Sequence, residues 1–142
     1  MSSLYLLDTN VLVALLRGGG ESARPRLRQA EGRVAVSTVS EMELEDGVER
    51  SRDAQRNRQA VDGLLSLVEV LPLDSLAAMH AGRIRAILAD RGTPIGPYDA
   101  LLAGHARSLG LVMVTSDVGE FSRVPGLEVE NWLADDGASG TR

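Results

Sequence analysis

Short, mostly apolar runs that alternate with helix-like stretches are the feature that most constrains the fold of this chain. Such runs occur at residues 4–7, 34–36, 68–71, 111–114 and 127–129, and polar residues, glycine or proline bound them. Runs of this kind are typical of strands that are buried on both faces of a parallel sheet. We therefore expect an α/β fold with helices on both sides of a short central sheet.

The stretches between these runs have the spacing and end signals of helices. We expect helices at 11–16, 22–31, from Ser37 or Ser40 to 52, 54–67, 75–91 and 98–109, and one helical turn at 118–123. Gly110 follows the helix at 98–109 as a helix-ending glycine. A length of 142 residues suits one domain. The expected organisation is a single domain at 1–133 and a short polar C-terminal tail at 134–142.

Four acidic residues stand where the alternating pattern brings the chain to one edge of the sheet. Asp8 directly follows the first strand, and Asp117 follows the fourth. Asp99 lies in the first turn of the helix before the fourth strand, and Glu43 lies near the start of the helix after the second. In open α/β sheets, ligands bind beyond the carboxyl ends of the strands, near the point where the strand order reverses.

Each acid also has an ordinary structural explanation. Asp8 could cap the next helix, and Glu43 could form a capping box with Ser40. Asp99 could complement a helix dipole, and Asp117 could be a turn residue. Taken together these explanations weaken, because four converging carboxylates repel one another strongly unless a cation holds them.

Oxygen ligands suit a hard cation, so the expected ion is Mg²⁺ or Mn²⁺. Such a site polarises a phosphoryl oxygen and lowers the pKa of a bound water, which makes phosphodiester hydrolysis the natural reaction. The composition agrees, because the chain has no cysteine and no lysine and only two histidines, His80 and His105. Thiol nucleophiles, thiolate zinc sites, lysine-dependent phosphate loops and three-histidine zinc sites are thereby excluded within one chain.

Two other functions are compatible with an acidic pocket. A non-catalytic module could keep the pocket only to bind an arginine-rich partner. A phosphoaspartyl phosphatase or receiver-like domain would also place Asp8 at the end of the first strand. The missing lysine, and Asn10 where a second acid would be needed, argue against that third possibility.

The motifs around these acids resemble those of PIN-domain nucleases, and their order and spacing resemble VapC-type toxins of bacterial toxin–antitoxin pairs. The resemblance extends from about Leu4 to Leu133. It rests on residues 6–10 (LLDTN), Glu43-Leu44 with Gly47, residues 95–103 (IGPYDALLA), residues 114–117 (VTSD) and residues 125–132 (PGLEVENW).

This resemblance implies a PIN-like three-layer α/β/α fold with a mostly parallel sheet of four to five strands. It implies a Mg²⁺- or Mn²⁺-dependent endoribonuclease that acts on structured RNA such as tRNA or rRNA. It also implies a homodimer and a cognate VapB-like antitoxin whose tail blocks the active site. The absence of cysteine fits a reducing cytoplasm, which is the location we expect. The family's acidic quartet, catalytic and metal-binding, maps onto Asp8, Glu43, Asp99 and Asp117. Thr115 maps onto a supporting hydroxyl, and we expect Asn10 to orient neighbouring groups.

Three neighbouring acids compete for these roles. Glu41 and Glu45 each lie two residues from Glu43, and residues two apart on a helix point to nearly opposite faces. The leucine after Glu43 and the glycine four residues on favour Glu43. Glu120 could join a second metal, although a solvent-facing position on a short turn is the preferred interpretation. His80 and His105 are expected to be packed or surface residues, because neither has a carboxylate partner at metal-binding spacing.

The charge pattern suggests where RNA would bind. The formal net charge is −5, and it falls to −1 without the four acids of the candidate site. A guanidinium matches phosphate geometry well. We therefore expect one stretch of arginines to contact the RNA backbone, namely Arg17, Arg24, Arg26 and Arg28. No apolar run approaches the roughly 20 residues that a bilayer-spanning helix needs, so no membrane contact is expected.

Overall fold

A computed structural model of the chain describes residues 3–133, and the tail expected at 134–142 lies outside these residues. The five strands are β1 (Tyr5–Leu7), β2 (Val34–Ser37), β3 (Glu69–Leu71), β4 (Val112–Val114) and β5 (Val129–Glu130). The helices are α1 (Thr9–Leu16), α2 (Ala23–Gln29), α3 (Thr38–Arg50), α4 (Ala54–Leu65), α5 (Ser75–Asp90), α6 (Pro97–Leu109) and α7 (Val118–Phe121). None of these helices is long and apolar enough to cross a bilayer.

The strands form one sheet in the order β3-β2-β1-β4-β5, and every neighbouring pair is parallel. The first strand lies at the centre, where Leu6 pairs with Ala35 on one side and with Met113 on the other. The chain first builds the sheet outward from β1 to β3 and then crosses to the opposite side of β1. The strand order therefore reverses between β1 and β4, which is where such sheets bind ligands.

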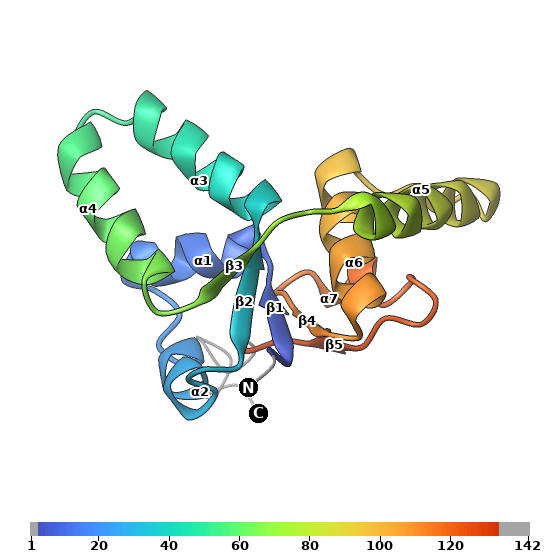
Figure 1. Ribbon diagram of the computed structural model, residues 1–142, viewed down its shortest axis with the longest axis horizontal. Helices are drawn as coiled ribbons and strands as arrows, with labels where there is room; N and C mark the ends of the chain where they lie inside the picture. Colours follow the sequence, from blue (N-terminus) through green and yellow to red (C-terminus); the bar gives the residue numbers. More distant parts are fainter. Residues whose placement is uncertain (1–2, 134–142) are drawn as a thin grey trace.

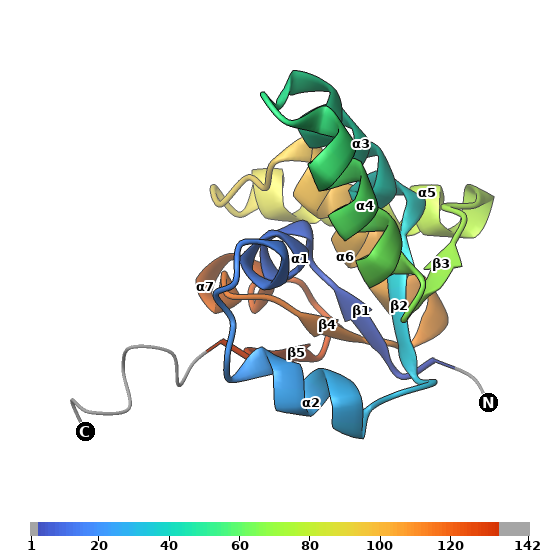
Figure 2. The same ribbon diagram turned by 90° about the vertical axis from the view of Figure 1, so that its left-hand side faces the viewer.

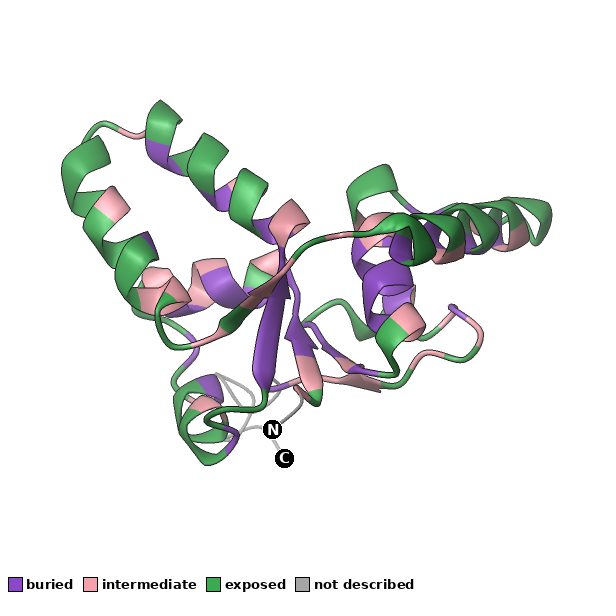
Figure 3. Cartoon of the chain, in the orientation of Figure 1, coloured by how far each residue is buried: buried purple, intermediate pink, exposed green. Residues whose placement is uncertain are grey.

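Side chains alternate between the two faces of the sheet, and this alternation creates two separate cores. Leu6 and Met113 face the core that α5, α6 and α7 cover, whereas Leu7 and Val114 face the core under α1–α4. Figures 1 and 2 show the two groups of helices on opposite sides of the sheet. The buried positions concentrate along the strands and the helix faces turned towards them (Figure 3). The expected three-layer α/β/α architecture is confirmed.

The pair α5 and α6 packs unusually closely because of one glycine. A Cβ atom added at Gly104 would lie 2.5 Å from the backbone nitrogen of Ala81 and 2.8 Å from the carbonyl oxygen of Ala77. These are backbone atoms of the facing helix, so no side-chain rotation can relieve the clash. Gly104 thus sets the approach of the two helices, and α6 carries Asp99 in its first turn.

The element ends differ from the sequence expectation by a few residues. The strand β5 was expected at 127–129 and is found at Val129–Glu130. The amide of Leu127 donates to the carbonyl oxygen of Val124, so the chain is still turning there. The predicted glycine end of α6 is confirmed, since Gly110 has the positive φ of 68° that glycine adopts without strain.

Candidate active site

The reversal of strand order brings Asp8 and Thr115 side by side at the ends of β1 and β4. The amide of Asp8 donates to the carbonyl oxygen of Val114 at 2.8 Å, which ties the first residue after β1 to the neighbouring strand. The hydroxyl of Thr115 donates to Asp8 Oδ2 at 2.7 Å and accepts from the amide of Asp117 at 2.9 Å. Asp8 is the N-cap residue of α1, yet its side chain makes no capping bond. The backbone amides of Thr9 and Asn10 nevertheless lower the pKa of Asp8, so its carboxylate also interacts with the first turn of α1.

Burial shapes the acidity of Asp8. Its side chain is only 2% exposed. This burial raises the pKa of Asp8 to about 6, against the lowering effect of the Thr115 hydroxyl, and the charge of Asp99 raises it further. A buried carboxyl with a raised pKa is typical of a site that binds a cation or exchanges a proton.

Asp99 faces Glu120 across the junction of α6 and α7. Burial raises the pKa of Asp99 to about 7, and the hydrogen bond with Glu120, the charge of Glu120 and the charge of Asp117 add to the effect. The Oε1 atom of Glu120 is buried and has no hydrogen-bond partner. The preferred interpretation of Glu120 as a solvent-facing turn residue was wrong, because the single turn of α7 folds this side chain back towards Asp99.

Asp117 also has a local structural role. Its side chain accepts from the amide of Glu120 at 3.2 Å and so caps α7. The structure therefore agrees with the explanation of Asp117 as a turn residue, and the charge of Asp117 also raises the pKa of Asp99. The cap holds α7 in the position from which Glu120 reaches Asp99.

Glu43 of α3 reaches the start of α1 through a contact with the Thr9 hydroxyl. The N-cap of α3 is Ser37, whose side chain accepts from the amide of Val39, so the capping box considered for Ser40 and Glu43 does not form. Instead, Thr9 Oγ1 donates to Glu43 Oε1 at 2.6 Å and lies 2.8 Å from Ser40 Oγ. Because Thr9 directly follows Asp8, this contact brings Glu43 to the start of α1.

The two glutamates that competed with Glu43 point elsewhere. Glu41 is exposed on α3. Glu45 pairs with Arg58 of α4. Asn10, expected to orient neighbouring groups, is exposed at the start of α1.

The residues present suit a divalent cation in their chemistry. Every candidate ligand is a carboxylate, and the unpartnered buried oxygen of Glu120 leaves one acceptor unsatisfied. Within residues 3–133, no group of three or more aspartate, glutamate or histidine side chains lies close enough together to hold a metal ion, so the four predicted acids do not form one cluster. Mg²⁺ does not require such a cluster, since it is usually held by one or two carboxylates, waters and substrate phosphates.

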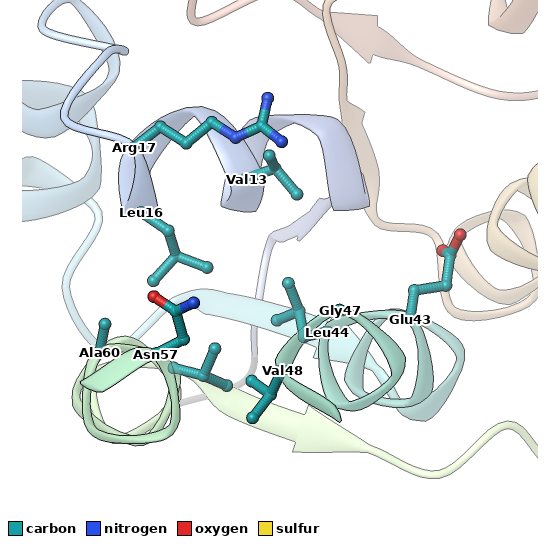
Figure 4. A pocket seen from close by; sticks show the side chains of 10 residues that line it. Val13, Leu16, Arg17, Glu43, Leu44, Gly47, Val48, Asn57 and Ala60 are labelled. Carbon is teal, nitrogen blue, oxygen red and sulfur yellow. The ribbon is translucent and has the colours of Figure 1, made fainter. Parts of the chain in front are cut away.

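A groove beside the acids runs between α1, α3 and α4. It has a volume of about 220 Å³, and Figure 4 shows Glu43 at one end and Arg17 near the other, with Val13 and Leu44 between them. Arg17 is thus the one arginine of the predicted RNA-binding set that lines this groove.

The other three predicted RNA-binding arginines lie on α2. This helix is at the end of the sheet where β1 and β2 begin, whereas Asp8 follows the end of β1 (Figure 1). Arg26 pairs with Glu130 at 2.9 Å and lies 5.3 Å from the ring centre of Trp132. Arg24 donates to the carbonyl oxygen of Leu15. The structure therefore does not bring the α2 arginines, Arg28 included, together with the acids.

Both histidines lie outside the acidic group. His105 is buried, its Nδ1 atom lies 2.9 Å from Ser37 Oγ, and burial lowers its pKa. His80 accepts a hydrogen bond from Arg107 at 3.0 Å. Their packed positions agree with the expectation from the sequence.

Comparison with known proteins places this arrangement in a family. The profile of the PIN domain matches residues 5–127. The chain is 44% identical to the tRNA(fMet)-specific endonuclease VapC of Salmonella typhimurium over 128 residues, which cover 90% of this chain and 97% of that protein. It is 36% identical to ribonuclease VapC2 of Haemophilus influenzae, over 91% of this chain and 98% of that protein. A crystal structure of DNA-bound VapBC from Salmonella typhimurium matches with a TM-score of 0.88 at 44% identity, over 92% of this chain and 98% of that one.

Proposed function

This chain belongs to the PIN domain family, and from that membership we propose that it is a divalent-metal-dependent VapC endoribonuclease that cuts structured RNA. VapC-type ribonuclease activity is the function of its relatives, and toxin–antitoxin complexes are their assemblies. The initiator tRNA, tRNA(fMet), is the first substrate to consider, because the relative that is 44% identical acts on it.

The observation that carries the proposal is the meeting of acids from separate elements at the reversal of strand order. The charge of Asp99 on α6 acts on Asp8 after β1, the charge of Asp117 after β4 acts on Asp99, and Glu43 contacts Thr9, the residue next to Asp8. Burial, and after it the neighbouring acids, make ionisation costly in the free protein, in line with the raised pKa values of Asp8 and Asp99. A bound cation offsets that cost.

We assign Asp8, Glu43, Asp99 and Asp117 as the residues that would hold Mg²⁺ or Mn²⁺, and we add Glu120 as a further acceptor. When bound, such a cation polarises a phosphoryl oxygen and lowers the pKa of water.

The other groups of the chain orient these ligands. The Thr115 hydroxyl aims the carboxylate of Asp8, and the cap on α7 keeps Glu120 opposite Asp99. Arg17 stands where the groove continues beyond Glu43 and is the arginine best placed to bind an RNA phosphate.

The proposed partners follow from the same relatives. A VapB-like antitoxin is the expected inhibitor, since solved relatives are VapBC complexes. We also propose that the chain acts in the cytoplasm as a homodimer.

The test is a cleavage assay with purified protein, labelled tRNA(fMet) and ribosomal RNA, with Mn²⁺ or with EDTA. We expect cleavage of at least one RNA with Mn²⁺ and none with EDTA. The Asp8→Asn variant should be inactive, and cleavage that survives this change would place the activity elsewhere. Absence of cleavage together with tight binding of an arginine-rich antitoxin tail would favour a non-catalytic binding module instead.

A further inference from the structure

Thr9 lies between two side chains of α3 and has no part in the acidic set itself. Its hydroxyl oxygen is 2.6 Å from Glu43 Oε1 and 2.8 Å from Ser40 Oγ. We propose that Thr9 is a positioning residue that relays a hydrogen bond from Ser40 to Glu43 and thereby sets the affinity of the site for a divalent cation. The proposal rests on the proposed function, in which Glu43 is a metal ligand.

The directions of the two hydrogen bonds follow from proton counting. A carboxylate only accepts, so Thr9 donates its single hydroxyl proton to Glu43. With that proton committed, the Thr9 oxygen can only accept from Ser40, and the Ser40 hydroxyl must donate. The chain of bonds therefore runs one way, from Ser40 through Thr9 to Glu43.

The relay is anchored in the interior of the protein. Ser40 is fully buried in the first turns of α3, so water does not compete for its hydroxyl. Glu43, by contrast, is only partly buried and has a long side chain with several rotatable bonds. A hydrogen bond from a fixed hydroxyl restricts the positions that its carboxylate samples before a metal arrives.

Asp8, the residue before Thr9, is held by a similar pair of hydrogen bonds. The Thr115 hydroxyl donates to Asp8 Oδ2, and a backbone amide donates to the Thr115 oxygen in turn. Asp8 and Thr9 are consecutive, so one residue bonds towards β4 and the next bonds towards α3. Residues 8 and 9 thus connect the proposed ligand Asp8 with the proposed ligand Glu43. Thr9 and Glu43 are 34 residues apart in the sequence.

The test measures Mn²⁺ binding to the full chain by isothermal titration calorimetry, with no RNA present. Thr9→Val keeps the shape of the side chain and removes the hydroxyl, whereas Thr9→Ser keeps the hydroxyl. We expect Thr9→Val to weaken Mn²⁺ binding by about 10-fold or more, the usual effect of removing a group that orients a ligand. Thr9→Ser should bind Mn²⁺ like the unchanged protein. Thr93→Val, the same change far from the acids, should also leave the affinity unchanged.

A double-mutant cycle separates positioning from a general structural effect. In a Glu43→Gln background, Thr9→Val should add no further loss of Mn²⁺ affinity, because the group through which Thr9 acts is already altered. If Thr9→Val does not fold, Ser40→Ala removes the donor behind the relay and should also weaken Mn²⁺ binding. Thermal unfolding without metal identifies which variants are folded.

The outcomes distinguish this proposal from the proposed function. Equal Mn²⁺ affinity of Thr9→Val and the unchanged protein, or an additive loss in the Glu43→Gln background, overturns the role of Thr9. If the unchanged protein neither binds Mn²⁺ nor cleaves RNA, the metal-dependent function itself fails. If the unchanged protein binds Mn²⁺ and cleaves RNA while Thr9→Val does the same, only the positioning role is lost.

Discussion

Replacing Asp8 with asparagine should remove activity and, at neutral pH without metal, make the protein more stable. Asparagine has nearly the same shape, and its carbonyl oxygen can still accept the hydrogen bond from Thr115. What changes is the charge, which burial disfavours at this position. The substitution therefore tests the electrostatic cost of the site with little change in packing.

The size of the effect follows from the shift in the pKa of Asp8, from the ordinary value of 3.8 to about 6. A difference of roughly two pKa units corresponds to about 3 kcal/mol. Because the folded state holds the proton more tightly than the unfolded chain, the fold loses stability as pH rises from about 4 to 6. The loss of stability caused by ionising the buried Asp8 carboxyl is absent below about pH 4 and complete above about pH 6. Asp8→Asn should then be more stable by up to about 3 kcal/mol at pH 8 and about equal at pH 4.

Thermal unfolding of both proteins in EDTA at pH 4 and at pH 8 measures the difference. For a chain of this length, the expected gain of Asp8→Asn at pH 8 is about 6–12 °C in Tm. Added Mn²⁺ should raise the Tm of the unchanged protein more than that of the variant, because a ligand stabilises the state that binds it. A stability gap of the same size at both pH values, or a less stable variant at pH 8, would refute the reasoning.

Three further predictions concern the products, the second acid pair and the helix contact. RNA cleavage should leave 5′-phosphate and 3′-hydroxyl ends, since neither histidine lies among the acids to direct attack by the 2′-hydroxyl; end-labelling that reveals 2′,3′-cyclic phosphates would contradict this. Glu120→Gln should lower the pKa of Asp99 from about 7 by removing a neighbouring charge, which NMR titration of the metal-free protein detects; an unchanged pKa would show that the two do not interact. Gly104→Ala should destabilise the fold by about 1–3 kcal/mol in urea unfolding because α5 and α6 must separate, whereas Gly63→Ala on exposed α4 should be neutral or stabilising; equal effects would argue against the close contact.

Features that depend on neighbours in the sequence could be predicted, and features that depend on distant partners could not. Asp8 and Asp117 follow apolar strands, so their place at the strand ends was evident from the sequence. The solvent-facing interpretation was preferred for Glu120 because its contact with Asp99 depends on how α7 folds back onto α6. The sequence did contain a sign that Glu120 lies near Asp117, since Glu120 follows Asp117 by three residues in the same helical turn.

The hydroxyl relay and the arginines show the same limit. The partners of Thr9 lie 31 and 34 residues away, at a contact that no local spacing encodes. Arg26 finds its partner Glu130 at a separation of 104 residues. From the sequence, the arginine-rich stretch predicted a surface that binds RNA phosphates. In the structure, the guanidinium of Arg26 instead pairs with Glu130 and lies over the ring of Trp132.

The strands of this sheet are very short, and that has a consequence for how the protein tolerates change. The strands β1 and β4 contain three residues each, so each is only about 10 Å long. Tyr5, whose ring centre lies 5.1 Å from that of Trp132, is the first residue of β1, so only this three-residue strand separates that contact from Asp8. Substitutions within these strands should therefore lower stability and activity together, unlike substitutions of the acids beyond the strand ends.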